Sequence, residues 1–301
     1  MESLNIPEYF SLMSSQEEIN KGARDICDAI RNALSSDDGA LIGRNGTIEL
    51  ESMIFSMKPM KLPTLENNAG VFPILQGDTF MKWRDASIEA TQYANVLAAG
   101  WYPPLKESEA DALKCWGTLA VECPLRSLEA YYVDPSIQWT QLLKGHKVAV
   151  VTSFTETAKK QVANLSAIWP LSNPLPSDIE WSWVQTGHPP SVAQGRNEWP
   201  AHISTWSDAV NHVVSEVIRT ESRFALVGCG GLSMPIAKAL KDRGIITIVL
   251  GGAIQVLFGI KGRRWATHSV ISKFWNEAWV WPSIEETPRG AAGVEGACYW
   301  G

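Results

Sequence analysis

The sequence has no long hydrophobic run and no secretion signal. Its longest apolar stretches, such as residues 245–250, are far shorter than the roughly 20 residues that cross a bilayer as a helix. The N-terminal residues 1–10 include acidic side chains early and lack the basic-then-apolar order of a signal peptide. We therefore expect a cytoplasmic protein with no transmembrane segment.

The chain also lacks the cysteine and histidine patterns of a metal centre. The 5 cysteines are scattered and none forms a C-x-x-C pair, which argues against a disulfide framework and a zinc site. The 5 histidines show no i, i+4 pairing with a metal-binding carboxylate. The residues alone therefore assign no metal ligands.

Positive charge is in deficit, because 26 Lys and Arg stand against 32 Asp and Glu, giving a net charge of −6. Such a chain is not expected to have nucleic acid as its main partner. Tryptophan, in contrast, is plentiful, with 14 residues. These rings are typical of core and loop packing, and also of the flat apolar platforms that sugar-handling proteins present.

Strand and helix patterns alternate in the second half of the chain. Strands are expected at residues 146–152, 179–185, 223–227 and 245–250, with helices at 155–169, 205–220 and 233–243. This alternation predicts right-handed crossovers and a parallel sheet with helices on both faces. We expect residues 1–301 to form a single doubly wound α/β domain with a mainly parallel, Rossmann-like sheet.

The first half is less regular. An amphipathic helix is expected at residues 14–36, with Ser15 and Glu18 as a capping box. A short strand at 40–43, a loop at 58–74 and helices at 47–57, 78–99 and 107–117 follow. Residues 118–144 carry mixed signals and receive no assignment. The tail, residues 282–301, has little pattern and is expected to wrap the surface.

Three glycine-rich loops follow expected strands, where open parallel sheets bind ligands. The first, residues 43–49, reads GRNGTIE. Two glycines around Arg44 let backbone amides approach an anion closely. The same segment equally suits a tight turn in which Glu49 favours the positive end of the helix macrodipole.

The second loop, residues 227–233, resembles a dinucleotide-binding fingerprint. However, the next strand ends in Gly251 and Gly252, where NAD-binding and S-adenosylmethionine-binding units usually place an acid for the ribose hydroxyls. The missing acid disfavours a dinucleotide. A nucleotide or a diphosphate on the backbone amides remains favoured.

The third loop, residues 251–265, gathers Lys261, Arg263 and Arg264 within four positions. Bringing such cations together is costly unless an anion neutralises them. A solvated basic loop is the alternative, but the neighbouring aromatic residues argue against it. Diphosphate binding is therefore favoured.

If the three loops converge on one edge of the sheet, they form a single site for a nucleoside-diphosphate ligand. The residues expected to bind it are Gly43, Arg44, Asn45, Gly46, Thr47, Gly228, Gly230, Gly231, Gly251, Gly252, Gln255, Lys261, Arg263 and Arg264. A sugar transfer that inverts configuration also needs a general base. Glu49, Asp78 and Glu156 are the catalytic candidates, although Asp78 also suits an N-cap and Glu156 the first turn of its helix.

Residues 44–49, RNGTIE, are similar to the Arg-x-Gly-Asp-Gly-Glu stretch of the GT-D-fold glycosyltransferases, in which a D-x-E motif engages the nucleotide-sugar and its metal. Residues 227–252 also look like the back half of that fold. The chain more closely resembles a group of poorly characterised proteins of polysaccharide-biosynthesis loci, over most of residues 38–300. The segments that carry this resemblance are 153–157, 251–255, 258–265 and 294–300.

The resemblance implies a glycosyltransferase that moves a sugar from a nucleoside-diphosphate-sugar donor to a glycan or glycolipid acceptor. Thr47 stands where the first acid of D-x-E is expected, so dependence on Mn²⁺ or Mg²⁺ stays open, and the basic residues 261–264 would take over charge neutralisation. One alternative is a non-catalytic subunit that binds a nucleotide-sugar or a glycan. Another is a Rossmann-like methyltransferase or dehydrogenase that uses the Gly228 loop.

Overall fold

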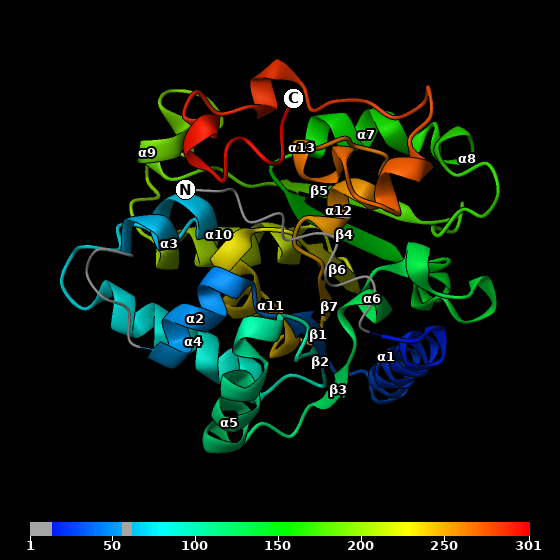
Figure 1. Cartoon of the computed structure of the whole chain (residues 1–301), viewed down its shortest axis with the longest axis horizontal. Helices are drawn as coiled ribbons and strands as arrows, with labels where there is room; N and C mark the ends of the chain where they lie inside the picture. Colours follow the sequence, from blue (N-terminus) through cyan, green and yellow to red (C-terminus); the bar gives the residue numbers. More distant parts are fainter. Residues whose placement is uncertain (1–13, 56–61) are drawn as a thin grey trace.

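The computed structural model describes residues 14–55 and 62–301. Within them lies a seven-stranded sheet in the order β3-β2-β1-β7-β6-β4-β5, and every pair of neighbouring strands is parallel (Figure 1). The strands are β1 (Ala40–Arg44), β2 (Val96–Ala98), β3 (Val121–Cys123), β4 (Lys147–Thr152), β5 (Glu180–Gln185), β6 (Phe224–Val227) and β7 (Ile246–Val249). The expected doubly wound α/β fold with a parallel sheet is confirmed.

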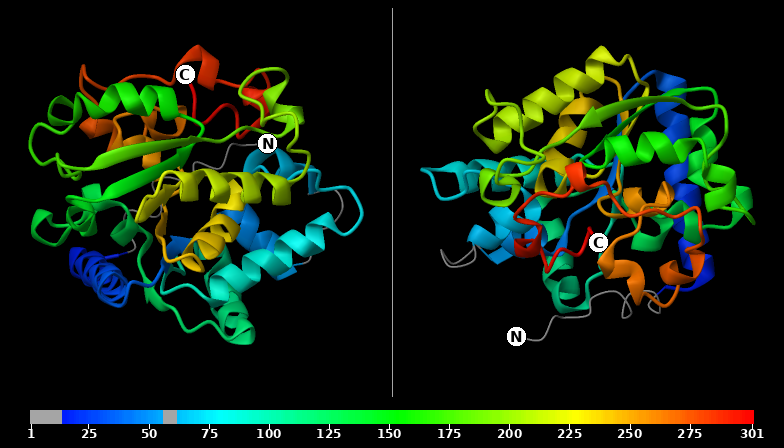
Figure 2. Two further views of the ribbon diagram at one scale, coloured as in Figure 1. Left: turned by 180° about the vertical axis from the view of Figure 1, so that it is seen from behind. Right: turned by 90° about the horizontal axis from the view of Figure 1, so that it is seen from above.

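Helices cover both faces of the sheet, as Figures 1 and 2 show. One layer contains α2 (Thr47–Phe55), α3 (Leu62–Ala69), α4 (Thr79–Gln92), α5 (Lys106–Trp116), α10 (Trp206–Arg219) and α11 (Ser233–Lys241). The other contains α1 (Gln16–Ser36), α6 (Leu125–Leu128), α7 (Thr155–Val162), α8 (Leu165–Ile168), α9 (Pro190–Ala193), α12 (Ala253–Leu257) and α13 (Arg263–Ala266). This arrangement leaves the carboxyl ends of the strands free to hold a site.

The central strands are largely apolar because both of their faces are buried, with Thr247 in β7 as an exception. In β4, Val148 and Val150 join the core beneath α1 and α7, whereas Ala149 and Val151 join the core beneath α10 and α11. Successive side chains of a strand point to opposite faces, so few positions of a strand covered on both sides suit polar side chains. This explains why the second half of the sheet was readable from the sequence.

The first half of the sheet corrects three expectations. Residues 78–99 were predicted as one helix, but α4 ends at Gln92 and the chain enters β2. The side-chain Oδ1 of Asn95 accepts the Leu41 N–H at 2.9 Å, and the backbone N–H of Asn95 donates to the Leu41 carbonyl at 2.8 Å. This short apolar run also suits a helix, and pairing with β1 makes it a strand.

The other two corrections concern segments without a predicted element. Helix α3 occupies part of the expected loop at 58–74, and the unassigned residues 118–144 contain β3, α6 and three 3₁₀ turns. The predicted end of the second helix near residue 57 and the signal-free residues 1–10 lie outside the described residues. Among the residues that are described, no helix is long and apolar enough to cross a membrane.

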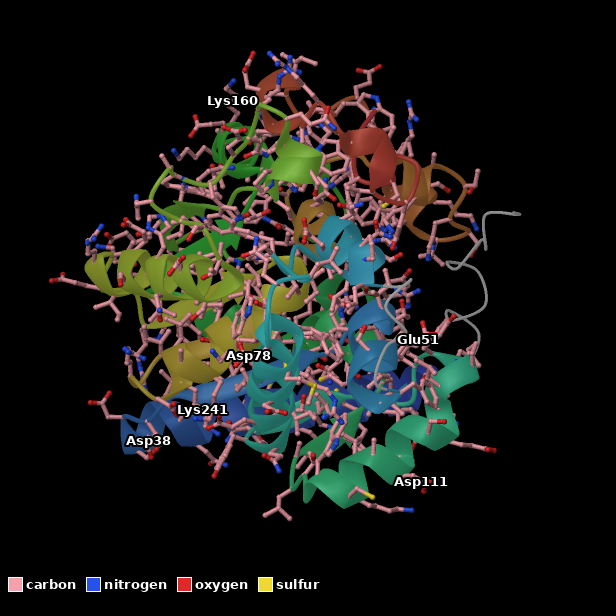
Figure 3. The ribbon with its side chains drawn as sticks, turned by 90° about the vertical axis from the view of Figure 1, so that its left-hand side faces the viewer. Asp38, Glu51, Asp78, Asp111, Lys160 and Lys241 are labelled. Carbon is pink, nitrogen blue, oxygen red and sulfur yellow. The ribbon has the colours of Figure 1, made fainter. Side chains whose placement is uncertain are left out.

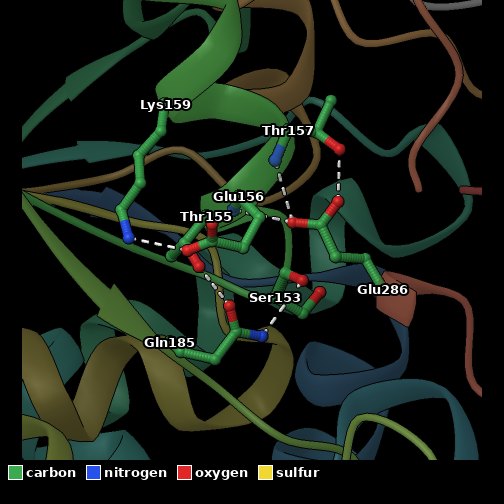
Figure 4. Close-up of polar contacts among 7 residues, drawn as sticks. All are labelled: Ser153, Thr155, Glu156, Thr157, Lys159, Gln185 and Glu286. Carbon is green, nitrogen blue, oxygen red and sulfur yellow. Dashed lines mark hydrogen bonds and ion pairs between the residues drawn. The ribbon is translucent and has the colours of Figure 1, made fainter. Parts of the chain in front are cut away.

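The C-terminal tail, residues 282–301, lies at the surface, but side chains along it, such as Val294 and Trp300, pack into the core. Figure 4 shows the Glu286 carboxylate at the start of α7, where Oε1 accepts the N–H groups of Glu156 at 2.8 Å and Thr157 at 3.1 Å. Such a carboxylate satisfies orphan amides and favours the helix macrodipole. Trp300 is 1% exposed and its Nε1–H donates to the Glu286 carbonyl at 3.0 Å. The tail is therefore anchored at both ends.

Candidate functional site

A cavity of about 250 Å³ opens at the carboxyl ends of the parallel strands. Its wall includes residues at or just after the ends of β1, β4, β5, β6 and β7, which are Arg44, Thr152, Thr186, Gly228 and Val249. The tail closes one side with Val294, Glu295, Tyr299 and Trp300. The cavity therefore lies where parallel sheets bind ligands.

Arg44 lies in this wall at the end of β1. Its guanidinium carbon stands 5.4 Å from the centre of the Trp101 ring. It packs directly on Gly251, where an added Cβ would lie 2.1 Å from the Arg44 Nη2 and where φ is +56°. Only glycine satisfies both conditions, so Gly251 makes room for the arginine.

Arg264 lines the cavity from α13. It donates to the Tyr299 hydroxyl at 2.7 Å, and its Nη2 lies 3.6 Å from the Glu295 carboxylate. Both partners belong to the C-terminal tail, so the tail orients this arginine. Tyr299 is close enough to both Arg44 and Arg264 for each of them to act on its pKa, which burial raises to about 12.

The other two cations of the third loop, Lys261 and Arg263, lie outside the cavity wall. The Lys261 Nζ stands 5.5 Å from the centre of the Trp275 ring. Arg263 is exposed. The physical reason is the short helix α13, in which successive side chains leave the axis in different directions, so that adjacent arginines cannot face one cavity. Of the three cations, Arg264 is the one that lines the cavity.

The predicted glycines divide in the same way. Gly46, Gly228, Gly230, Gly251 and Gly252 line the cavity. Gly43 and Gly231 are absent from its wall and pack inside the protein, where an added Cβ would lie 3.0 Å from the Met234 sulfur and 2.8 Å from a Val71 methyl, respectively.

Two of the lining glycines also have a structural reason to be glycine. A Cβ on Gly228 would lie 2.8 Å from the Gly251 carbonyl, and one on Gly230, whose φ is +50°, would lie 2.6 Å from the Ala69 carbonyl. Asn45, the residue after β1, is 3% exposed, and its amide donates to the Thr91 hydroxyl at 3.2 Å. It ties the first loop to α4 and is absent from the wall, whereas Thr47 and Gln255 lie in it.

Of the three catalytic candidates, Glu49 alone lies in the cavity wall. Its carboxylate folds back over Gly46, where an added Cβ would lie 2.1 Å from Oε2. Burial raises the pKa of Glu49, while a backbone hydrogen bond and nearby Arg44 partly oppose this.

Asp78 and Glu156 were expected near the same edge of the sheet, but neither lies in the cavity wall, although Glu156 follows the carboxyl end of β4. Asp78 is on the outside of the molecule, pairs with Lys82 at 3.1 Å and has a side chain 68% exposed (Figure 3). The Glu156 side chain pairs with Lys159 at 2.6 Å (Figure 4). Each carboxylate is held by a lysine of its own helix, which is the usual fate of an exposed acid at a helix start.

Sequence reasoning missed the Arg126 group, by which we mean Arg126, Glu129 and His268. All three line the cavity and are less than one tenth exposed. Arg126 Nη1 donates to the Glu129 carboxylate, and Nη2 lies 3.4 Å from the His268 Nε2. No local motif could have joined Arg126 to His268, because they are 142 positions apart.

Two residues of the cavity wall, Gln255 and His188, each have a buried polar atom without a hydrogen-bond partner among the described residues. Gln255 is 1% exposed and donates to the Tyr299 carbonyl at 3.2 Å, but within the described part of the chain its Oε1 receives no hydrogen bond. The buried Nε2 of His188 likewise has no partner there, and burial lowers the pKa of this histidine to about 4. Buried polar atoms are normally satisfied, so we regard these two as groups that a ligand in the cavity could satisfy.

A preformed metal centre does not fit the donor set. Across residues 14–55 and 62–301 there is no group of three or more His, Cys, Asp or Glu side chains that could hold a metal ion. Of the acids in the wall, Glu129 binds Arg126 and Glu295 faces Arg264. No step below therefore runs through a metal.

No family model, curated protein or solved structure matches the chain significantly. A fold of this class hosts many unrelated activities, so the fold does not decide the function. The function has to be argued from the cavity: its arginines, its glycine turns, its buried carboxylate and its unsatisfied polar atoms.

Proposed function

We propose that this chain is a glycosyltransferase that moves a sugar from a nucleoside-diphosphate-sugar donor to a glycan or glycolipid acceptor. The observation that carries the proposal is that Arg44, Arg264 and the glycine turns after β6 and β7 line one cavity. Arginine matches phosphate oxygens with a planar fork of donors, and glycine lets the backbone approach them. A diphosphate is the ligand that uses both features.

Arg44 is the better placed of the two arginines for the donor. Among the described residues it forms no ion pair within 4 Å, although it lies near enough to Glu49 to lower the pKa of that carboxyl, whereas Arg264 faces Glu295 at 3.6 Å. A half-buried cation without a direct ion pair gains most from an anionic ligand. We assign Arg44 to the diphosphate and Arg264 to a flanking position held by the tail.

Aromatic side chains supply the remaining contact surface. Trp101, Trp199, Trp265 and Trp300 all contribute to the cavity wall. Flat rings of this kind bury a sugar face or a nucleobase. The free Oε1 of Gln255 accepts a hydrogen bond from a hydroxyl or an amino group of such a ligand.

The chemistry then needs charge stabilisation and a base. In an inverting transfer the acceptor oxygen bonds to the anomeric carbon, the bond to the diphosphate breaks, and the hydroxyl proton passes to a base. Arg44 and Arg264 stabilise the charge that develops on the leaving diphosphate. Glu49 is the base, because it is the lining carboxylate without an ion-pair partner in the described structure and its pKa is raised by burial.

A second candidate is a non-catalytic subunit that binds a nucleotide-sugar. It is favoured by Thr47, which stands in the cavity wall where the GT-D motif has an acid. A methyltransferase or dehydrogenase is not proposed, because Gly251 and Gly252 follow β7 in place of the acid that holds ribose.

The test is incubation with UDP-, GDP-, CDP- and dTDP-sugars, with and without manganese, followed by mass spectrometry for donor hydrolysis or transfer. Wild-type protein should release the nucleotide from at least one donor, and Glu49→Gln should slow the release by 10²-fold or more, as an order of magnitude for a lost general base. The matched control is Glu156→Gln. Binding without turnover supports the subunit, and absence of both rejects the proposal.

A further inference from the structure

The Arg126 group forms a second set of donors in the cavity, separate from the arginines assigned above. Arg126 is 7% exposed and His268 is 3% exposed, and both line the cavity. Arg126 comes from α6, and His268 follows α13. The sugar-transfer chemistry described so far uses neither residue.

Half of the Arg126 guanidinium is committed inside the protein. Its Nη1 donates to Glu129, and its plane covers the Tyr132 ring at 4.5 Å from the centroid. The buried Nε has no hydrogen-bond acceptor in the part of the chain that the structure describes. Nε–H and the Nη2–H on the same edge form the fork with which arginine binds two oxygens of a phosphate or carboxylate. Among the described residues, neither N–H group of this fork donates to an oxygen.

His268 adds a third donor beside the fork. Its Nδ1 accepts the backbone N–H groups of Val270 at 3.1 Å and Ile271 at 3.2 Å. A neutral imidazole that accepts at Nδ1 carries its proton on Nε2. Burial, with a contribution from Arg126, lowers the pKa of His268 to about 4, so the ring is neutral at pH 7. Its Nε2–H therefore faces the Arg126 Nη2 at 3.4 Å, donor against donor.

Two donors placed against each other need a shared acceptor. We propose that Arg126 and His268 form an oxyanion subsite that holds a phosphate or carboxylate group of the acceptor substrate. One such group receives hydrogen bonds from Nε and Nη2 of Arg126 and from Nε2 of His268. The inference rests on the proposed function, which it extends to an anionic acceptor, such as a phosphorylated lipid or an acidic glycan.

The charge balance separates this subsite from the donor phosphates. Glu129 already compensates the charge of Arg126, so the subsite suits a single oxyanion bound mainly by hydrogen bonds. A diphosphate carries more charge and is better matched at Arg44, which forms no ion pair within 4 Å among the described residues. One cavity thus holds two anion positions of different character.

The experiment is calorimetric titration of the full chain with inorganic phosphate, alone and with saturating UDP, GDP, CDP or dTDP. Two variants remove donors without stranding a charge. R126M/E129Q removes the fork together with its counter-ion, and His268→Asn keeps an acceptor for the two amides while losing Nε2–H. The matched control is the exposed Arg263→Met. Thermal unfolding checks that each variant folds. If the double variant does not fold, His268→Asn alone tests the proposal.

We expect the phosphate Kd to rise at least 10-fold in both variants and to stay unchanged in Arg263→Met. Wild-type protein should still bind phosphate when a nucleoside diphosphate is bound. Wild-type affinity in both variants overturns the subsite. Full competition by the nucleoside diphosphate also overturns it, because the oxyanion then belongs to the donor. If no nucleotide binds but phosphate still depends on Arg126 and His268, the subsite stands and the sugar-transfer proposal falls.

Discussion

Arg44 and Arg126 line the same cavity, yet different interactions hold them. Arg44 ends a strand and stands over Trp101, whereas Arg126 is enclosed by Glu129, Tyr132 and His268. A buried charge is tolerated only when it is paired, so Arg126 is part of the structure as well as a source of donors. Arg44 forms no ion pair within 4 Å in the described part of the chain, and only its longer-range interaction with Glu49 offsets its charge, so we assign it to a ligand.

Removing the charge of each arginine is the most direct way to break this comparison. Arg126→Met leaves Glu129 buried without its partner, and we expect a loss of about 3–5 kcal/mol in the free energy of unfolding. Arg44→Gln should cost about 1 kcal/mol or less. Urea denaturation measures both. In R126M/E129Q most of the loss should be recovered, and equal losses in the two single variants would contradict the distinction.

A methyl group at Gly251 tests the packing beneath Arg44. Gly251→Ala places a Cβ against the guanidinium at a φ of +56°, so we expect a loss of about 1–3 kcal/mol and displacement of the arginine. Thermal unfolding and nucleotide titration report the two effects. Gly293→Ala is the matched control, because its added Cβ meets nothing within 4 Å. Unchanged stability in both variants would show that Arg44 is not held as described.

The anchoring of the tail can be tested at Glu286. Glu286→Gln removes the charge that caps α7, and we expect a loss of about 1 kcal/mol, with weaker order in the wall that carries Arg264. The exposed neighbour Glu285 provides the control, Glu285→Gln. Hydrogen exchange of the Glu156 and Thr157 amides should accelerate only in the first variant. Equal exchange rates in both variants would contradict the capping of α7 by the Glu286 carboxylate.

The smallest effect concerns the pH dependence that Glu49 contributes. Because burial raises the pKa of Glu49 in the folded state, the native protein holds this proton more tightly than the unfolded chain. Its contribution to stability is therefore complete below the unfolded pKa and is lost as pH rises through the folded pKa. Glu49→Gln should match wild type at low pH and exceed it at higher pH. Parallel melting curves at all pH values would contradict the burial of this carboxyl.

The predictable part of the site lies where local sequence and sheet geometry coincide. Arg44, Gly228 and Gly251 follow strands of one parallel sheet, so knowing the strands was enough to bring them together. The same reasoning cannot tell which way a side chain turns. Gly43 and Asn45 belong to the first loop and face the interior. Of the three cations in the third loop, only Arg264 faces the cavity.

The unpredictable part depends on contacts between distant segments. Arg126 lies in the stretch that received no assignment, and its partner His268 belongs to the other end of the chain. The tail gave no periodic signal because its short 3₁₀ turns are held by Trp300 and Glu286 instead of by a helix pattern. Similarly, β2 looked helical until pairing with β1 was known.

The central claim is that one cavity grips a nucleoside diphosphate through Arg44 and Arg264. The most direct test is calorimetric titration of wild type, Arg44→Gln, Arg264→Gln and Arg263→Gln with UDP, GDP, CDP and dTDP. We expect that at least one nucleotide binds, and that its affinity falls about 10-fold or more in the first two variants, equivalent to about 1.4 kcal/mol, and stays unchanged in the third. Equal affinity in all four proteins, or no binding to any of them, would contradict it.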